Sequence, residues 1–313
     1  MDMDTSQIFS LTVIVGILTA GIRLAAPYLF ASLGEMFSQR SGVLNLGVEG
    51  QMLMGAFFAF YYTVQTGSPW LGLLAAMVVG AVMGFAMAVV SVRWRAVQGI
   101  SGIGFFIFGV GMSELLFKTM LGEVIIINNG FNPIVIPFLS EIPVLGPIFF
   151  RQNFMTYLAF LLVPISWFIL YKTTLGLKIR AVGENPHAAD TLGVSVAKIR
   201  YLTVTMGGVM SGIAGAALSI ANLNVFQENM TAGMGFIAVA LVYFGGWRPF
   251  GVMFGALLFS MVMALQLFMQ VFNVAIPSEF AVMLPYILTI VVLVLTVGRV
   301  RGPSALTEPF VRE

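Results

Sequence analysis

The chain has 313 residues and a formal net charge of +2. Hydrophobic residues make up 59% of it and charged residues only 9%, whereas a soluble domain carries about 25% charged residues. So little charge cannot cover a soluble surface, and several apolar runs exceed the roughly 18 residues typical of a membrane-spanning helix. The composition therefore predicts a multi-pass membrane protein. The absence of cysteine excludes disulfides, thiol catalysis and thiolate metal sites.

Polar breaks divide the chain into apolar windows, which we interpret as transmembrane helices. The windows cover residues 8–33, 43–64, 70–92, 99–120, 153–171, 201–221, 232–247, 251–272 and 280–298. The first window is long enough to tilt, or to continue as a helix past the membrane edge. The sequence thus predicts an all-α fold, with about nine transmembrane helices in a single transmembrane domain over residues 1–313.

The charges indicate one orientation. Cytoplasmic loops of membrane proteins are enriched in Lys and Arg. If residues 181–200 are cytoplasmic, alternation of the spans places every basic residue except Arg23, Lys118 and Arg151 on the cytoplasmic side. The same alternation places these acidic residues outside: Asp2, Asp4, Glu123, Glu141, Glu228 and Glu279. We therefore expect the N-terminus outside and the C-terminus in the cytoplasm.

Residues 121–152 form the one long outer segment. It contains Pro133, Pro137, Pro143 and Pro147, which forbid a continuous helix. We expect an ordered extracytoplasmic cap of loops with a short helix. It is either a plain connector or a surface on which a partner protein docks.

Catalytic motifs are missing from the sequence. It holds a single histidine, His187, and no HExxH, GxGD or paired in-membrane carboxylates. It also lacks a Walker A sequence, so it has no P-loop with which to bind ATP. We therefore expect no enzymatic activity, no metal site and no cofactor in this chain. An ion-driven carrier usually needs an intramembrane acidic site, and only Glu49 is a candidate.

Several polar residues fall inside the windows, where ionisable groups are costly and usually face protein or water. Glu114 and Lys118 are four residues apart and are expected to pair on one helix. Asn45 and Glu49 are also four apart, hence on one predicted helix face, with Gln51 close by. These three residues either line a polar translocation path or join helices to one another.

The segment "AVGENPHAADTLGVSVAKIR", residues 181–200, is the longest water-facing stretch and belongs to a cytoplasmic loop over residues 172–200. Asn185 suits a helix cap and Pro186 a first turn, while Gly193 is a typical helix stop. The pattern predicts a short helix of about two turns. Ala188 and Ala189 would give it a small, smooth face that fits a groove of another protein. The alternative, a helix lying on the membrane surface, lacks large apolar side chains to insert.

Here the chain resembles a known family. "HAADTLG" is similar to the EAAxxxG pattern of the coupling loop in bacterial ABC-importer permeases, with His187 in place of the Glu and with Ala188, Ala189 and Gly193 matching. The whole loop resembles the branched-chain amino acid/ribose permease family. The stretches "RSGVLNLGVEGQMLMGAFFAF" and "MTAGMGFIAVALVYFGGWRPFGVMFGALLF" are similar to its nucleoside and simple-sugar branch, and "LPYILTIVVLVL" fits its last span. The likeness runs from about residue 20 to 298 and is strongest to the shorter permease of nucleoside importers.

The resemblance implies a division of labour. A separate ATPase with two nucleotide-binding halves would bind the ATP and dock on the coupling loop. The loop residues concerned are Glu184, Asn185, Pro186, His187, Ala188, Ala189 and Gly193. A second, homologous permease would complete the pore as a heterodimer, and an extracytoplasmic binding lipoprotein would deliver the solute. No nucleic acid is involved, and the location would be the bacterial cytoplasmic membrane.

The resemblance further implies nucleosides, such as the purine nucleoside guanosine, as the transported solute. Asn222, Asn224 and Phe226 lie near the outer end of a span and would suit a ribose and a base, or they form a plain polar loop. The alternatives are a permease for simple sugars of the ribose type or for branched-chain amino acids, and, from another class, a stand-alone secondary carrier or channel.

Overall fold

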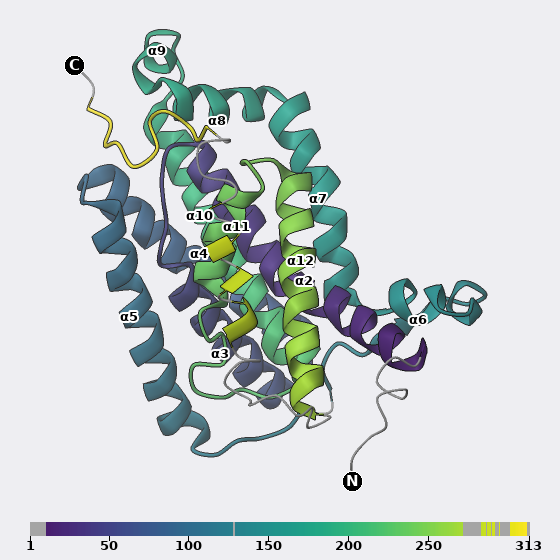
Figure 1. Cartoon of the computed structure of the whole chain (residues 1–313). Helices are drawn as coiled ribbons and strands as arrows, with labels where there is room; N and C mark the ends of the chain where they lie inside the picture. Colours follow the sequence, from purple (N-terminus) through teal and green to yellow (C-terminus); the bar gives the residue numbers. More distant parts are fainter. Residues whose placement is uncertain are drawn as a thin grey trace.

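The computed structural model describes residues 11–127, 129–271 and 301–311, together with 283–285, 287–288, 290–291 and 294. Helices dominate these residues and form one bundle (Figure 1). The α-helices are α2 (Leu11–Arg40), α3 (Val48–Thr66), α4 (Pro69–Ala88), α5 (Gln98–Leu116), α6 (Leu145–Phe149), α7 (Phe154–Lys172), α8 (Thr174–Glu184), α9 (Pro186–Thr191), α10 (Val196–Ala216), α11 (Met234–Phe244) and α12 (Pro249–Val271).

Three of the long helices end in a π-helical turn, where one extra residue widens the last turn. These turns are η1 (Val89–Arg93) after α4, η2 (Phe117–Leu121) after α5 and η4 (Ala217–Asn222) after α10. A short 3₁₀ helix, η3 (Leu139–Glu141), and the strands β1 (Pro133–Val135) and β2 (Arg151–Asn153) complete the described elements.

Most predicted spans coincide with helices of the described residues. Among the described residues, six helices are long and apolar enough to cross a membrane, which supports the predicted all-α, multi-pass class. The prediction that residues 232–247 form a full transmembrane helix is wrong. Helix α11 has only 11 residues. At 1.5 Å per residue it is about 16 Å long, whereas the hydrocarbon core of a membrane is roughly 30 Å thick. The window 280–298 lies largely outside the described residues.

Helix α10 lies at the centre of the bundle. In the span that α10 and its π-helical turn form, 83% of the residues in the most apolar stretch are buried. In the other described spans the share is 22–44%. Two small-residue faces, Gly80/Gly84 on α4 and Gly208/Gly212 on α10, pack directly against each other. A Cβ on Gly208 would overlap the backbone of Gly80 and Gly84. In the absence of side chains here, van der Waals contact between backbones holds α4 and α10 together.

The two ends of the bundle differ. Helices α8 and α9 and residues 301–311 gather at one end, whereas α6 and the start of α2 lie at the other (Figure 1). The predicted outer segment, 121–152, contains loops and the five-residue helix α6, as expected. The antiparallel pairing of β1 with β2, Pro133 opposite Asn153, was not predicted from the sequence.

The contact of α4 with α10 makes a testable prediction. Gly208→Ala should lower the free energy of unfolding by about 1–3 kcal/mol, since the added methyl group meets backbone atoms that have no rotamer to change. The matched control is Gly111→Ala on α5, where nothing lies within 4 Å of the added Cβ. Thermal unfolding in detergent measures both. An unchanged midpoint for Gly208→Ala would contradict the close packing.

Candidate functional site

Helix α9 begins where the sequence predicts. Asn185 is its N-cap, and the side-chain Oδ1 accepts a hydrogen bond from the Ala188 N–H at 3.0 Å. Pro186 occupies the first helical position, where its missing N–H costs nothing and its fixed φ suits the helix. A six-residue helix is too short to be stable alone, so this cap and the contacts with the bundle hold α9 in place.

The end of α9 is equally well defined. Gly193 has φ +79°, a left-handed conformation that favours glycine. Its N–H donates to the Asp190 carbonyl at 2.9 Å, and the Val194 N–H donates to the Ala189 carbonyl at 3.0 Å. These two bonds form a Schellman motif, which satisfies the last carbonyls of the helix. The predicted stop at Gly193 is therefore confirmed, and α9 is a rigid, doubly capped helix.

The outward face of α9 differs from the predicted one. Ala189 is 3% exposed and packs into the core of this chain, so it supports the helix from beneath. The exposed residues are His187, Ala188, Thr191 and Leu192. Leu192 is 84% exposed and was missed by the sequence analysis. The signal was the leucine beside the helix stop, which is the one large aliphatic side chain between Asn185 and Gly193.

The chain's C-terminal segment, residues 301–311, lies against the α8–α9 turn. Glu184, predicted as part of the loop contact, accepts a hydrogen bond from the Ser304 hydroxyl at 3.1 Å. The Ala305 N–H donates to the Gly183 carbonyl at 2.9 Å. The ring of His187 lies 5.1 Å from the ring of Phe310. This segment, which the sequence analysis did not single out, therefore fixes the position of α9 from the side.

Arg200 anchors the same segment from inside the bundle. It is 2% exposed, and it donates from Nε to the Ser41 carbonyl at 3.1 Å and from Nη1 to the Glu308 carbonyl at 2.9 Å. The Thr307 N–H donates to the Gly42 carbonyl at 3.1 Å. Arg200 thus links α10, the α2–α3 turn and residues 301–311 into one unit under α9.

Glu49 holds the short helix α11. Its carboxylate is 1% exposed and accepts hydrogen bonds from the Thr231 hydroxyl at 2.6 Å, the Gly233 N–H at 2.7 Å and the Gly235 N–H at 2.5 Å. Because Gly233 is the N-cap of α11, the buried carboxyl group lies at the end of the helix where N–H groups lack partners within the helix. This geometry favours the second of the two predicted roles, that of joining helices.

Asn45 does not lie on one helix with Glu49, because α3 begins at Val48. The predicted shared helix face is therefore wrong. Asn45 instead lies in the turn before α3, where its backbone N–H donates to Glu35 Oε1 at 3.0 Å and its Nδ2 donates to Gln51 Oε1 at 3.1 Å.

The hydrogen bonds of Asn45 belong to a larger network, which includes Glu35 and Gln39 of α2 and Trp247 after α11. Glu35 Oε1 also accepts from Gln39 Nε2 at 3.0 Å, and Gln39 Oε1 accepts from Trp247 Nε1 at 2.8 Å. Glu35, Gln39 and Gln51 are all fully buried. Sequence reasoning missed Glu35 and Gln39, although their spacing of four within "GEMFSQRSG" was a signal. The network connects α2 with the turns before α3 and after α11.

The predicted outer residues are distributed between loop and core. Asn222 is half-buried and accepts a hydrogen bond from Asn153 Nδ2 at 3.2 Å. Asn224 is half-buried in a left-handed turn. Phe226 is completely buried, with its ring 5.4 Å from those of Phe57 and Phe117. Of the three, only the two asparagines have any exposed surface.

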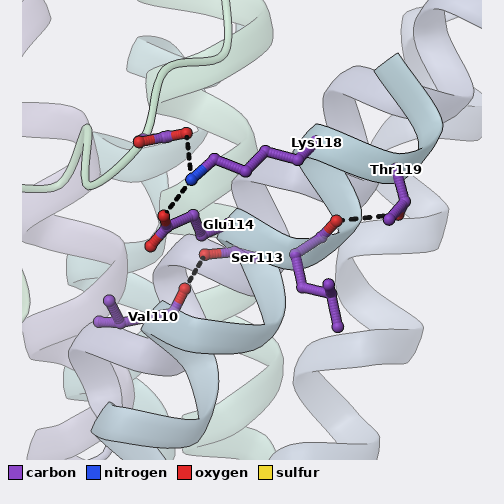
Figure 2. Close-up of polar contacts among 7 residues, drawn as sticks. Val110, Ser113, Glu114, Lys118 and Thr119 are labelled. Carbon is purple, nitrogen blue, oxygen red and sulfur yellow. Dashed lines mark hydrogen bonds and ion pairs between the residues drawn. The ribbon is translucent and has the colours of Figure 1, made fainter. Parts of the chain in front are cut away.

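A charged cluster lies at the C-terminal end of α5 and in the following turn η2. Lys118 Nζ contacts Glu114 Oε1 at 2.5 Å, as predicted, and also Glu228 Oε1 at 3.5 Å (Figure 2). All three side chains are substantially exposed, between 43% and 58%. Charged groups exposed on a membrane-length helix avoid lipid, so this face of α5 requires water or another protein beside it. Within the described residues, no three His, Cys, Asp or Glu side chains gather as a metal site.

Comparison with known proteins agrees with this arrangement. Residues 17–293 match the family described as branched-chain amino acid transport system / permease component. The chain therefore belongs to this family of membrane transport permeases. No solved structure matches it.

Three relatives are informative. The guanosine ABC transporter permease protein NupQ of Bacillus subtilis is 39% identical and covers 99% of both chains. The putative glucose ABC transporter permease protein TsgC13 of Haloferax volcanii is 40% identical, covering 95% of this chain and 98% of the relative. The guanosine ABC transporter permease protein NupP of Bacillus subtilis is 28% identical over 76% of this chain and 70% of its own.

The role of Glu49 is open to a direct test. Glu49→Ala should lower the free energy of unfolding by about 1–3 kcal/mol, since buried donors at the start of α11 lose their acceptor. Glu114→Ala, which removes an exposed carboxylate, should change it by less than about 1 kcal/mol. Thermal unfolding in detergent compares the two variants. Normal stability of Glu49→Ala together with lost transport would instead favour a role in the translocation path.

Proposed function

We propose that this chain is a permease subunit of an ATP-driven ABC importer for nucleosides. The observation that carries the proposal is α9. It is a capped helix whose outward face is exposed, at one end of a membrane bundle, in a chain whose sequence has no P-loop of its own. Energy from ATP must then come from a separate ATPase, and α9 with Leu192 is the surface on which we propose that it docks.

We propose the orientation that the charges favour, with α9 in the cytoplasm of a bacterial cell and the first residues outside. Arg40, Arg93, Lys172, Arg200 and Arg248 all lie at or close to helix ends, at the predicted cytoplasmic side. The residue windows support nine spans, with α3 and the window 280–298 included and α11 as a half-length helix. Residues 121–152 would then face outward, where we propose that a substrate-binding lipoprotein docks.

A second, homologous permease is the other partner that we propose. One bacterium has both NupQ and NupP, each named as a guanosine ABC transporter permease protein, and this chain resembles NupQ over its whole length. A heterodimer of a NupQ-like and a NupP-like subunit is consistent with both names. The charged cluster of Glu114, Lys118 and Glu228 supports it as well, because that face of α5 needs a neighbour other than lipid.

For the solute, nucleosides are favoured because NupQ and NupP are both named as permeases for the nucleoside guanosine. Glucose is the second candidate, since TsgC13 is equally similar to this chain. Of the predicted path residues, only Asn222 and Asn224 are half-exposed, and we propose these as contacts at the outer mouth. We assign Asn45, Glu49, Gln51 and Phe226 to the protein interior.

Reconstituted transport decides the solute. The complete complex in liposomes, with binding protein and ATP, should take up labelled guanosine, and a hundredfold excess of unlabelled glucose should leave the rate unchanged. ATP-dependent uptake of glucose without uptake of guanosine would replace the proposal with the sugar alternative. Uptake without any ATPase subunit would contradict the ABC class itself.

The docking surface yields a separate prediction. Leu192→Asp should weaken binding of the ATPase at least about tenfold, equivalent to about 1.4 kcal/mol, because a charge would replace an exposed apolar contact. Leu192→Met keeps an apolar side chain of similar volume and should bind as the wild type does. Co-purification of the ATPase with each variant measures the effect. Equal binding by both variants would rule out Leu192 as a contact.

A further inference from the structure

A polar cavity of about 390 Å³ opens beside α9. Its walls include Arg93 and Arg95 after α4, Arg200 and Tyr201 on α10, and the single acidic residue Asp190. Three arginines and one aspartate therefore line the cavity. The balance of charge favours an anion as occupant, and arginine binds phosphate oxygens through paired hydrogen bonds.

Two further features of the wall support an anion. The first turn of α10 contributes Ser195, Val196 and Ala197, so the positive end of a 21-residue helix lies at the cavity. Arg93 and Arg95 are both exposed, so their guanidinium groups can reach an anion in the cavity, whereas Arg200 is 2% exposed and bonds to backbone carbonyls.

An apolar groove lies next to this cavity. It has a volume of about 510 Å³ and runs between α4 and α5, lined by Val82, Met83, Gly104 and Phe108 among others. The π-helical turn η1 joins the two sites, because Val90 lines the groove while Val92 and Arg93 line the cavity. A polar anion site that is continuous along the chain with an apolar groove suits an amphiphilic ligand.

The cavity also lies at the level where lipid headgroups are found. One membrane-length helix ends at Arg93, the next begins at Gln98, and the span of α10 begins at Val196. Trp94 lies between Arg93 and Arg95 and is 71% exposed. Tryptophan is enriched at the membrane–water boundary, and basic residues there attract anionic lipids.

We propose that this is a binding site for an anionic phospholipid. The headgroup phosphate lies at Arg93 and Arg95, and one acyl chain lies in the groove between α4 and α5. A free phosphate or an acidic protein surface would explain the arginines but would leave the groove without a function. The proposal is independent of the solute that the protein transports.

Native mass spectrometry of the purified chain in detergent tests the site, with phosphatidylglycerol compared with phosphatidylcholine as added lipid. The wild type should retain phosphatidylglycerol at least several-fold better. The double variant Arg93→Gln, Arg95→Gln should lose that preference. The matched control, Lys172→Gln with Lys178→Gln, removes two exposed charges elsewhere and should keep it.

A second pair of variants tests the groove. Gly104→Leu should reduce retention of phosphatidylglycerol, since the side chain fills a position where nothing lies within 4 Å of the added Cβ. Gly111→Leu, equally unobstructed on the same helix and not part of the groove, should have no effect. Monodisperse elution of both variants shows that folding is intact.

Three results would overturn the proposal. The first is equal retention of the two lipids by the wild type. The second is full displacement of the lipid by millimolar inorganic phosphate with no effect of Gly104→Leu, which would mean a free-anion site. The third is unchanged lipid retention by the double arginine variant with weakened binding of the ATPase, which would assign the arginines to a protein interface.

Discussion

The contact of α10 with its neighbours through bare backbone is the constraint on which the rest of the structure depends. Gly207 meets Gly34 of α2, Gly208 meets Gly80 of α4, and Gly215 meets the backbone of Met52 in α3. Without side chains at these contacts there is no rotamer that can absorb a displacement. A displacement of the start of α10 would therefore also move α2, α3 and α4, because side-chain motion at these contacts cannot absorb it.

In the proposed function, an ATPase that docks on α9 would displace the start of α10. Only residues 192–195 separate α9 from α10, and the Schellman motif and the Ser195 cap stiffen that turn. From the other side, residues 301–311 hold α9 through Glu184 and His187, and Arg200 anchors those residues to the bundle. Helix α9, its caps and residues 301–311 thus form one unit, which is joined to α10, the most buried of the described spans.

Local patterns in the sequence predicted local structure well. The caps Asn185 and Gly193 and the Glu114–Lys118 pair depend on residues within one or two turns. Long-range partners could not be predicted in this way. The spacing of Asn45 and Glu49 suggested one helix, yet α3 begins only at Val48. Each residue bonds to a different element. Burial of Ala189 and exposure of Leu192 likewise depend on how α9 rests on the bundle.

The central claim is that the exposed face of α9 contacts a separate ATPase, and site-specific cross-linking tests it most directly. The chain has no cysteine, so Ala188→Cys introduces one thiol on this face and Glu141→Cys introduces one at the opposite end of the bundle. A short bifunctional reagent should join Ala188→Cys to the ATPase and leave Glu141→Cys unjoined. A cross-link from Glu141→Cys, or none from Ala188→Cys in an assembled and transporting complex, would contradict the account.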